Sequence, residues 1–226
     1  MKGAEIKDNR KFLIKLLCIE FFLYYITPFL LSFTYHCYDG IYYGSMNTCF
    51  VNGVTIAAWF IEIDILHLYL ESRYGYELIS SKANRGKNLS DNKLLLLFII
   101  LIASVFIISA QIGFKVKPFY DFGTKFSGFE LINKISVLVK SGSKCLWITI
   151  FVRELQKLFE TKFKNKNIPY GGIALMFLMG IPDVFISDIN LAVTYILIYI
   201  VFGVIYLVTD RSFGKSLLAN LFIYIF

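Results

Sequence analysis

The stretch LLLLFIILIASVFIISAQIGF, residues 94–114, decides the fold class of this chain. It holds 21 residues and contains no Asp, Glu, Lys or Arg. The hydrocarbon core of a bilayer needs about 20 apolar residues in a helix, so this stretch predicts a membrane-spanning helix. The composition agrees, because 57% of the 226 residues are hydrophobic, against about 45–50% in average soluble domains.

Further apolar runs on both sides of this stretch predict an all-α, polytopic bundle of membrane helices. The expected spans are residues 16–35, 50–70, 94–114, 131–152, 171–187, 191–208 and 216–226. The last run covers only about 16 Å at 1.5 Å per residue, too little to cross a bilayer core alone. The run 16–35 is too long for a cleavable signal and reads as a retained anchor. We therefore expect six to seven transmembrane helices in a single integral membrane domain, residues 1–226.

The positive charges predict the orientation of this bundle. Alternate connections carry 17 of the 23 Lys and Arg residues, whereas the other connections carry three. By the positive-inside rule the N-terminus is cytoplasmic, and the protein is a multi-pass protein of the cell membrane. The net charge of +7 then reflects orientation and attraction to anionic membrane lipids. A nucleic-acid partner is not expected.

Two of the predicted spans carry ionisable residues. The second span contains Glu62, Asp64 and His67, and the fourth contains Lys140 and Lys144, which are four residues apart and share a helix face. Charged groups inside a span face the bundle interior, a water-filled cavity or a partner of opposite charge. We expect these five residues to form either a buried ion-pair network or the lining of a polar cavity, with Asp64 and His67 facing the two lysines.

No cofactor or metal site is predicted. Asp64, His67 and Glu71 fall on one helix face, but three ligands from a single helix rarely converge on one ion. The chain has no Cys-x-x-Cys, no Gly-rich phosphate loop and no His-Glu-x-x-His. Cys37 and Cys49 share a connection, residues 36–49, that has no Lys or Arg. They form a disulfide if that compartment is oxidising and the two thiols meet, and are otherwise free.

The C-terminal part of the chain has a recognisable layout. WITIFVRELQKLFETKFKNKNIPYGGIALMFLMGIPDVF, residues 147–185, places an arginine near the inner end of a span, then a basic stretch, a turn and a span with small residues. YILIYIVFGVIYLVTDRSFGKSLLANLFIYIF, residues 195–226, is a span, a short polar hairpin and a terminal apolar run. Residues 147–226 resemble the core of the CPBP family, the membrane-embedded CAAX-protease and bacteriocin-processing group.

The resemblance implies that the family's glutamate pair is missing from this chain. The first family motif is Glu-Glu-x-x-x-Arg, and in the family its second glutamate and the histidines of the other motifs activate water for peptide hydrolysis. Arg153 matches the arginine, whereas Ile148 and Thr149 stand at the glutamate positions. Glu154 lies about 100° around the helix from Arg153, so we do not expect it to replace either glutamate. Arg153 is left to cap a carbonyl or to bind a lipid phosphate.

The two other family motifs are also degenerate. For Phe-x-x-x-His, the segment MGIPD places Met179 at the Phe position and Asp183 at the His position. For His-x-x-x-Asn or Asp, the segment LANLFIY places Asn220 at the His position and Tyr224 at the last one. We expect Asp183 and Asn220 to stabilise packing by hydrogen bonds across the bundle.

These observations leave three functional classes open. The first is a non-catalytic CPBP-like protein that binds a hydrophobic or lipid-modified peptide or another membrane protein, in bacteriocin self-immunity or as an accessory scaffold. The second is an active intramembrane CAAX-type peptidase that uses other acids, such as Asp64 or Glu62 with His67. The third is a membrane subunit for small-molecule transport, whose charged residues line a cavity at mid-membrane.

Overall fold

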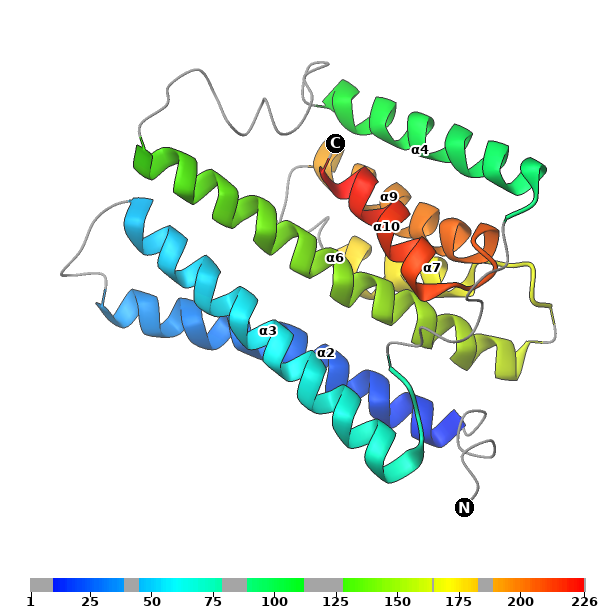
Figure 1. Ribbon diagram of the computed structural model, residues 1–226, viewed down its shortest axis with the longest axis horizontal. Helices are drawn as coiled ribbons and strands as arrows, with labels where there is room; N and C mark the ends of the chain where they lie inside the picture. Colours follow the sequence, from blue (N-terminus) through cyan, green and yellow to red (C-terminus); the bar gives the residue numbers. More distant parts are fainter. Residues whose placement is uncertain are drawn as a thin grey trace.

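The structure is a computed structural model that describes residues 10–38, 45–78, 89–111, 128–163, 165–182 and 189–225. These residues form seven α-helices and one π-helical segment, without a strand among them (Figure 1). The elements are α2 Arg10–Tyr38, α3 Ser45–Tyr74, α4 Asp91–Gln111, α6 Gly128–Lys162, α7 Tyr170–Leu175, η1 Met176–Gly180, α9 Ile189–Val208 and α10 Phe213–Ile225. The all-α prediction is confirmed for the described residues, and each predicted span overlaps a helix.

Four of the described helices are long and apolar enough to cross a membrane. They contain the segments Arg10–Leu31, Phe50–Tyr74, Asp91–Ala110 and Ile135–Lys162. The remaining apolar helical segments, Tyr170–Gly180, Val193–Val208 and Phe213–Ile223, are shorter. At 1.5 Å per residue the 13 residues of α10 cover about 20 Å, less than a bilayer core of about 30 Å.

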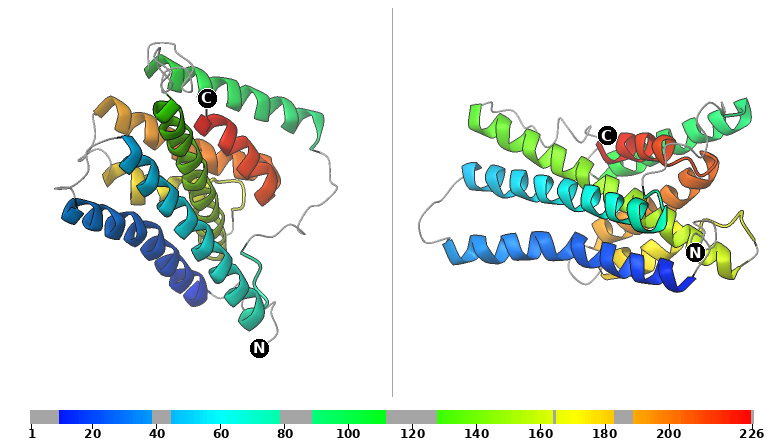
Figure 2. Two further views of the ribbon diagram at one scale, coloured as in Figure 1. Left: turned by 60° about the vertical axis from the view of Figure 1, so that its left-hand side comes forward. Right: turned by 60° about the horizontal axis from the view of Figure 1, so that its bottom comes forward.

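Helix α6 is the central element of the bundle. It packs against α2 and α3 on one side and against α7, α9 and α10 on the other, while α4 lies outside against α9 and α10 (Figures 1 and 2). The stretch Trp147–Gln156 is buried at every residue. A helix that is surrounded on all sides needs no polar face, which explains why this stretch shows no simple amphipathic pattern.

Helix α4 has the opposite environment. Of its residues 91–110, only Ser104 is buried. Many of its large apolar side chains are exposed, among them Leu96, Ile99, Ile102 and Phe106. Soluble proteins rarely expose apolar patches of this extent, whereas lipid chains cover such a surface at no cost. The exposure of α4 therefore agrees with a position in a membrane.

Glycines bring three helices into backbone contact. A Cβ added to Gly171 would lie 2.2 Å from the carbonyl oxygen of Val152 in α6. A Cβ added to Gly172 would lie 2.9 Å from the Cα of Gly203 in α9. Small residues permit this approach in the same way as they do between membrane helices. Residues 171 and 172 thus fix the position of α7 between α6 and α9.

Candidate functional site

The expected pairing of the second-span acids with the fourth-span lysines is not formed. The Lys140 ammonium donates to Asn52 Oδ1 at 2.9 Å. Asp64 lies on the exposed face of α3, and no ion pair within 4 Å joins it to Lys140 or Lys144 among the described residues. His67 Nε2 lies 3.6 Å from Glu71 Oε2, one turn along the same helix.

The exposed face of Asp64 and, for Lys140, the register between α3 and α6 explain this outcome. The two helices run in the same direction, because Asn52 contacts Ser136 and Lys140, while Tyr76 contacts Glu154 (Figure 1). Asp64 lies midway along α3 and is therefore level with the apolar turn around residues 145–148 of α6. Lys140 lies roughly a turn or two further along, at about 5.4 Å per turn. Lys144 lies close to the level of Asp64, but its ammonium is near Tyr195 of α9 and Asp64 lies on the exposed face of α3. A helical wheel gives neither the face that packs inward nor the register.

The remaining residues of the predicted polar cavity also have separate partners. Glu62 is half-buried and accepts a hydrogen bond from the Thr27 hydroxyl of α2. The Lys144 ammonium lies 5.9 Å from the ring centre of Tyr195 in α9. The five residues therefore do not line one cavity. No group of three metal-binding side chains occurs in the part of the chain that the structure describes.

A different set of ionisable residues does converge, at the end of the bundle where α3 ends. We call Glu20, Tyr76, Arg153, Glu154 and Lys157 the Glu154 cluster. The Tyr76 hydroxyl donates to Glu154 Oε2 and accepts from Lys157 Nζ at 2.6 Å. Glu154 Oε1 lies 3.3 Å from Lys157 Nζ and 3.5 Å from Arg153 Nε. Because Glu154 is fully buried, this double pairing offsets the cost of removing its charge from water.

Tyr76 reaches the cluster because a glycine follows the last residue of α3. Gly75 has a φ of +61°, a left-handed conformation that costs a glycine little. The chain then turns back, and the Tyr76 amide donates to the carbonyl of Leu70 at 3.1 Å. Burial, followed by the neighbouring Glu154 carboxylate, raises the pKa of Tyr76 well above its usual value. The hydroxyl therefore stays protonated and serves as a donor.

Arg153 caps two backbone carbonyls. Its Nη2 donates to the carbonyl oxygen of Glu77 at 2.8 Å, and its Nη1 donates to that of Leu78. The arginine itself is only 6% exposed. Of the two roles expected for Arg153, the described residues support carbonyl capping, because the planar guanidinium is already engaged by three acceptors.

The family-motif positions on α6 and α10 meet in the core. Asn220 Nδ2 donates to Thr149 Oγ1 at 3.1 Å, and both residues are fully buried. Glu154 points to another side of α6, toward Tyr76, so it does not occupy the place of Thr149. Asp183 and the side chains of Tyr224, Cys37 and Cys49 lie outside the described part of the chain, and the predictions on them stay predictions.

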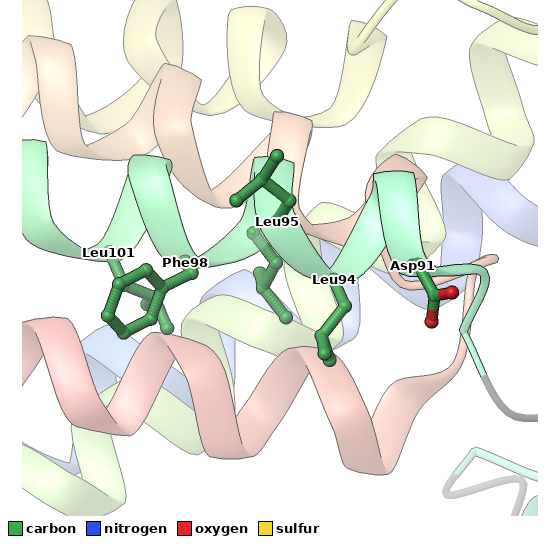
Figure 3. Close-up of a pocket in the computed structure, with 6 residues that line it drawn as sticks. Asp91, Leu94, Leu95, Phe98 and Leu101 are labelled. Carbon is green, nitrogen blue, oxygen red and sulfur yellow. The ribbon is translucent and has the colours of Figure 1, made fainter.

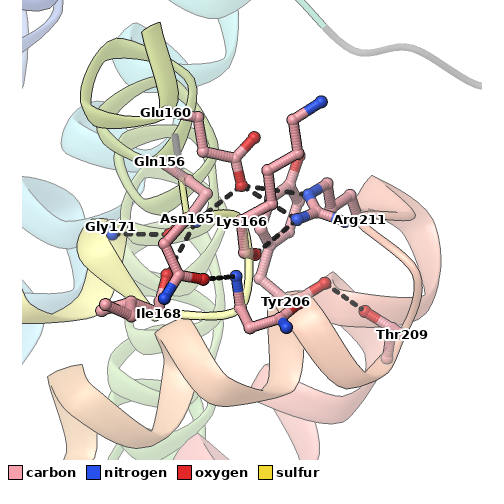
Figure 4. A network of polar contacts seen from close by, with 10 residues as sticks. Gln156, Glu160, Asn165, Lys166, Ile168, Gly171, Tyr206, Thr209 and Arg211 are labelled. Atoms are coloured by element: carbon pink, nitrogen blue, oxygen red, sulfur yellow. Dashed lines mark hydrogen bonds and ion pairs between the residues drawn. The ribbon is translucent and has the colours of Figure 1, made fainter. Parts of the chain in front are cut away.

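A second polar network ties the connection between α6 and α7 to the connection between α9 and α10 at the same end of the bundle (Figure 4). Arg211 donates to Glu160 Oε1 at 3.0 Å and to the carbonyl of Lys166 at 2.7 Å. Gln156 donates to Glu160 and accepts from the Gly171 amide at 2.8 Å. The neighbouring Asp210 pairs with Lys93 at the start of α4. Connections that the charge pattern assigns to one side of the membrane therefore meet in space.

An apolar pocket lies along α4. Its volume is about 560 Å³, and its lining consists of Asp91, Leu94, Leu95, Leu97, Phe98 and Leu101. In Figure 3, Leu94 and Phe98 extend toward α10, whereas Leu95 extends toward α9. Apart from the carboxylate of Asp91 at one end, the lining offers only hydrocarbon. The pocket is therefore suited to an apolar chain rather than to a polar ligand.

No protein-family model matches this chain, and no match to a curated protein or to a solved structure was found. The resemblance to the CPBP core consequently stays a prediction.

Sequence reasoning missed Glu20 and Tyr76. The signal for Glu20 was present, since it is an acid inside the predicted span 16–35, and the same rule that singled out Glu62 applies to it. Tyr76 gave no comparable signal, because it follows the second span in a polar connection where a tyrosine is ordinary.

Proposed function

We propose that this chain is a multi-spanning membrane protein with six or seven crossings and a cytoplasmic N-terminus. Successive described helices alternate in direction along the bundle (Figure 1). The interactions of Lys93 with Asp210 and of Arg211 with Glu160 support one common side for the basic connections. Under the positive-inside rule that side is the cytoplasm.

We further propose that the protein is a non-catalytic relative of the CPBP group. The observation that carries this proposal is the contact between Thr149 and Asn220. Two positions that the resemblance assigns to the ancestral active site are neighbours, but they hold a hydroxyl and an amide in a closed core. Neither group is a carboxylate base, and peptide hydrolysis by activated water requires a base. The replacement of the family's motif residues by Thr149 and Asn220 fits a protein that binds a peptide without cleaving it.

The proposed ligand is a hydrophobic or lipid-modified peptide, or an apolar segment of a membrane partner. The pocket along α4 supports this class, because it offers about 560 Å³ of apolar space on the outermost helix of the bundle. A protein of this kind acts in bacteriocin self-immunity or as an accessory scaffold. Membrane lipids surround it and are its permanent contacts.

The test uses a photoreactive farnesylated peptide and the full-length protein in lipid nanodiscs. We expect crosslinking that an excess of unlabelled farnesylated peptide competes away, without any cleaved peptide. Leu95→Trp, which fills the pocket, should reduce the crosslinking yield several-fold. Leu96→Trp, on the same helix but outside the lining, is the matched control. Equal labelling of both variants would refute binding at α4.

The same assay decides the alternative of an active intramembrane peptidase. Glu20 and Glu154 are two buried carboxyl groups within electrostatic range of each other, and paired carboxyl groups favour that alternative over the one based on Asp64. Cleavage that disappears in Glu154→Gln but persists in Asp64→Asn would establish a peptidase and overturn the non-catalytic proposal. The transport alternative gains no support, because its expected cavity residues have separate partners.

A further inference from the structure

Glu20 is a buried carboxyl group without a hydrogen-bond partner. It lies in the first half of α2 and is completely inaccessible to solvent. Neither of its carboxyl oxygens has a partner among the described residues. The charged groups that face it come from α6, namely Glu154, Lys157 and Arg153, and the Tyr76 hydroxyl lies against Glu154.

The two cations next to Glu20 are already engaged. Arg153 donates to the carbonyls of Glu77 and Leu78 and pairs with Glu154. Lys157 donates to Tyr76 and to Glu154 Oε1. An ionised carboxylate without a single donor is strongly unfavourable in a protein interior, whereas a protonated carboxyl group is tolerated there. This arrangement therefore suits a neutral Glu20.

We propose that Glu20 is a proton-binding site, and that release of its proton transfers the ammonium of Lys157 from Glu154 to Glu20. With the proton bound, Glu20 is neutral and the cluster keeps the pairing that the structure shows. When the proton leaves to water, Glu20 becomes a carboxylate and attracts the one cation of the cluster that has a flexible stem. Arg153 stays on the carbonyls of Glu77 and Leu78.

The charge balance of the cluster permits both states. Arg153 and Lys157 bring two positive charges and Glu154 one negative charge, so the cluster holds one unbalanced positive charge while Glu20 is neutral. Ionisation of Glu20 balances that charge. The Lys157 side chain is 30% exposed while Glu154 is fully buried, so Lys157 connects the cluster with the surface and gives the proton a way out.

A proton fits this site better than a metal ion does. Arg153 and Lys157 lie within electrostatic range of Glu20 and balance the two carboxylates, so the cluster has no net negative charge to attract a metal ion. A proton adds no volume, which matters because Glu20 is fully enclosed. The protonation state of Glu20 also determines which carboxylate pairs with Lys157. Because Lys157 donates to the Tyr76 hydroxyl, the same state affects the contact between α6 and the chain around Tyr76.

Infrared difference spectroscopy on the full-length protein in nanodiscs tests the proposal. The alkaline-minus-neutral spectrum of the wild type should show loss of a protonated carboxyl C=O band. That band should be missing in Glu20→Gln and retained in Glu62→Gln, a control in the half-buried glutamate of α3. In Lys157→Gln it should persist to higher pH by about one unit, a tenfold change in proton affinity. A band that survives in Glu20→Gln would overturn the proton site, and an unshifted band in Lys157→Gln would overturn the transfer.

Thermal unfolding supplies a second, independent reading. Glutamine resembles a neutral glutamic acid, so Glu20→Gln should leave the melting midpoint unchanged or raise it. Glu154→Gln should lower the midpoint clearly, because it leaves Arg153 and Lys157 without their shared carboxylate. An equal loss of stability in both variants would show that Glu20 is an ionised structural partner and would contradict the proposal.

Discussion

Gly172 of α7 and Gly203 of α9 pass each other at a separation that admits no side chain. A Cβ on Gly172 would lie 2.9 Å from the Gly203 Cα, and one on Gly203 would lie 2.7 Å from the Gly172 Cα. Both opposing atoms belong to the backbone, so neither can rotate away. The contact explains why the short α7 holds its place against α9.

Alanine at either of these glycines should destabilise the fold. We expect Gly172→Ala or Gly203→Ala to cost about 1–3 kcal/mol, since overpacking forces backbone shifts. Gly53→Ala is the matched control, because a Cβ at that position of α3 meets nothing within 4 Å and alanine favours the helix by about 0.5–1 kcal/mol. Thermal unfolding in detergent measures the difference. Similar melting midpoints for all three variants would refute the backbone contact.

The hydrogen bond between Asn220 and Thr149 gives a second prediction. Thr149→Val removes the acceptor of a fully buried amide and should cost about 1–3 kcal/mol. The double variant Thr149→Val, Asn220→Leu should recover most of that loss, because both polar groups are then gone. Chemical or thermal unfolding of the single and double variants forms a double-mutant cycle. Additive losses would show that the two side chains do not interact.

How much of this bundle is predictable depends on the kind of information required. Helix positions follow from apolar runs, and each expected span overlaps a helix. The helical period tells which residues share a face, but not which face packs inward, and Asp64 lies on the exposed face of α3. The register of α3 against α6 was not predictable either, because it is set by packing along both helices. The Glu154 cluster depends on the turn at Gly75, which carries Tyr76 back to α6. That contact joins residues 78 positions apart, and no local pattern encodes it.

The connection between α9 and α10 stores backbone strain. Asp210 and Arg211 have φ values of 56° and 58°, and a non-glycine residue in this region costs about 1–2 kcal/mol. The Arg211 amide donates to the Tyr206 carbonyl and the Asp210 amide to that of Leu207, at 2.8 and 3.1 Å, which closes α9 as a Schellman motif. Glycine is usual at such an end, so side-chain contacts to Glu160 and Lys93 must favour these residues.

Two substitutions at Arg211 separate strain from pairing. Arg211→Ala loses the contact with Glu160 and keeps the backbone cost, whereas Arg211→Gly loses the contact and relieves the cost. We therefore expect Arg211→Gly to melt above Arg211→Ala, by an amount equivalent to about 0.5–1 kcal/mol after allowing for the unfolded-chain entropy of glycine. Glu160→Gln, which removes one charge and leaves the backbone alone, is the control. A glycine variant no more stable than the alanine variant would contradict a strained turn.

The buried hydroxyl of Tyr76 should make stability depend on alkaline pH. Its pKa is raised in the folded protein, by burial first and by the Glu154 carboxylate second, whereas in the unfolded chain it is about 10. The unfolded state therefore releases this proton first. The contribution to stability is complete below about pH 10 and is lost as the pH rises above that value.

Tyr76→Phe removes this contribution and should flatten the decline in melting midpoint between about pH 9 and 11. Tyr69→Phe, at a side chain 47% exposed, is the control and should keep the decline of the wild type. Equal slopes in Tyr76→Phe and the wild type would show that Tyr76 ionises in the folded state as readily as in the unfolded one.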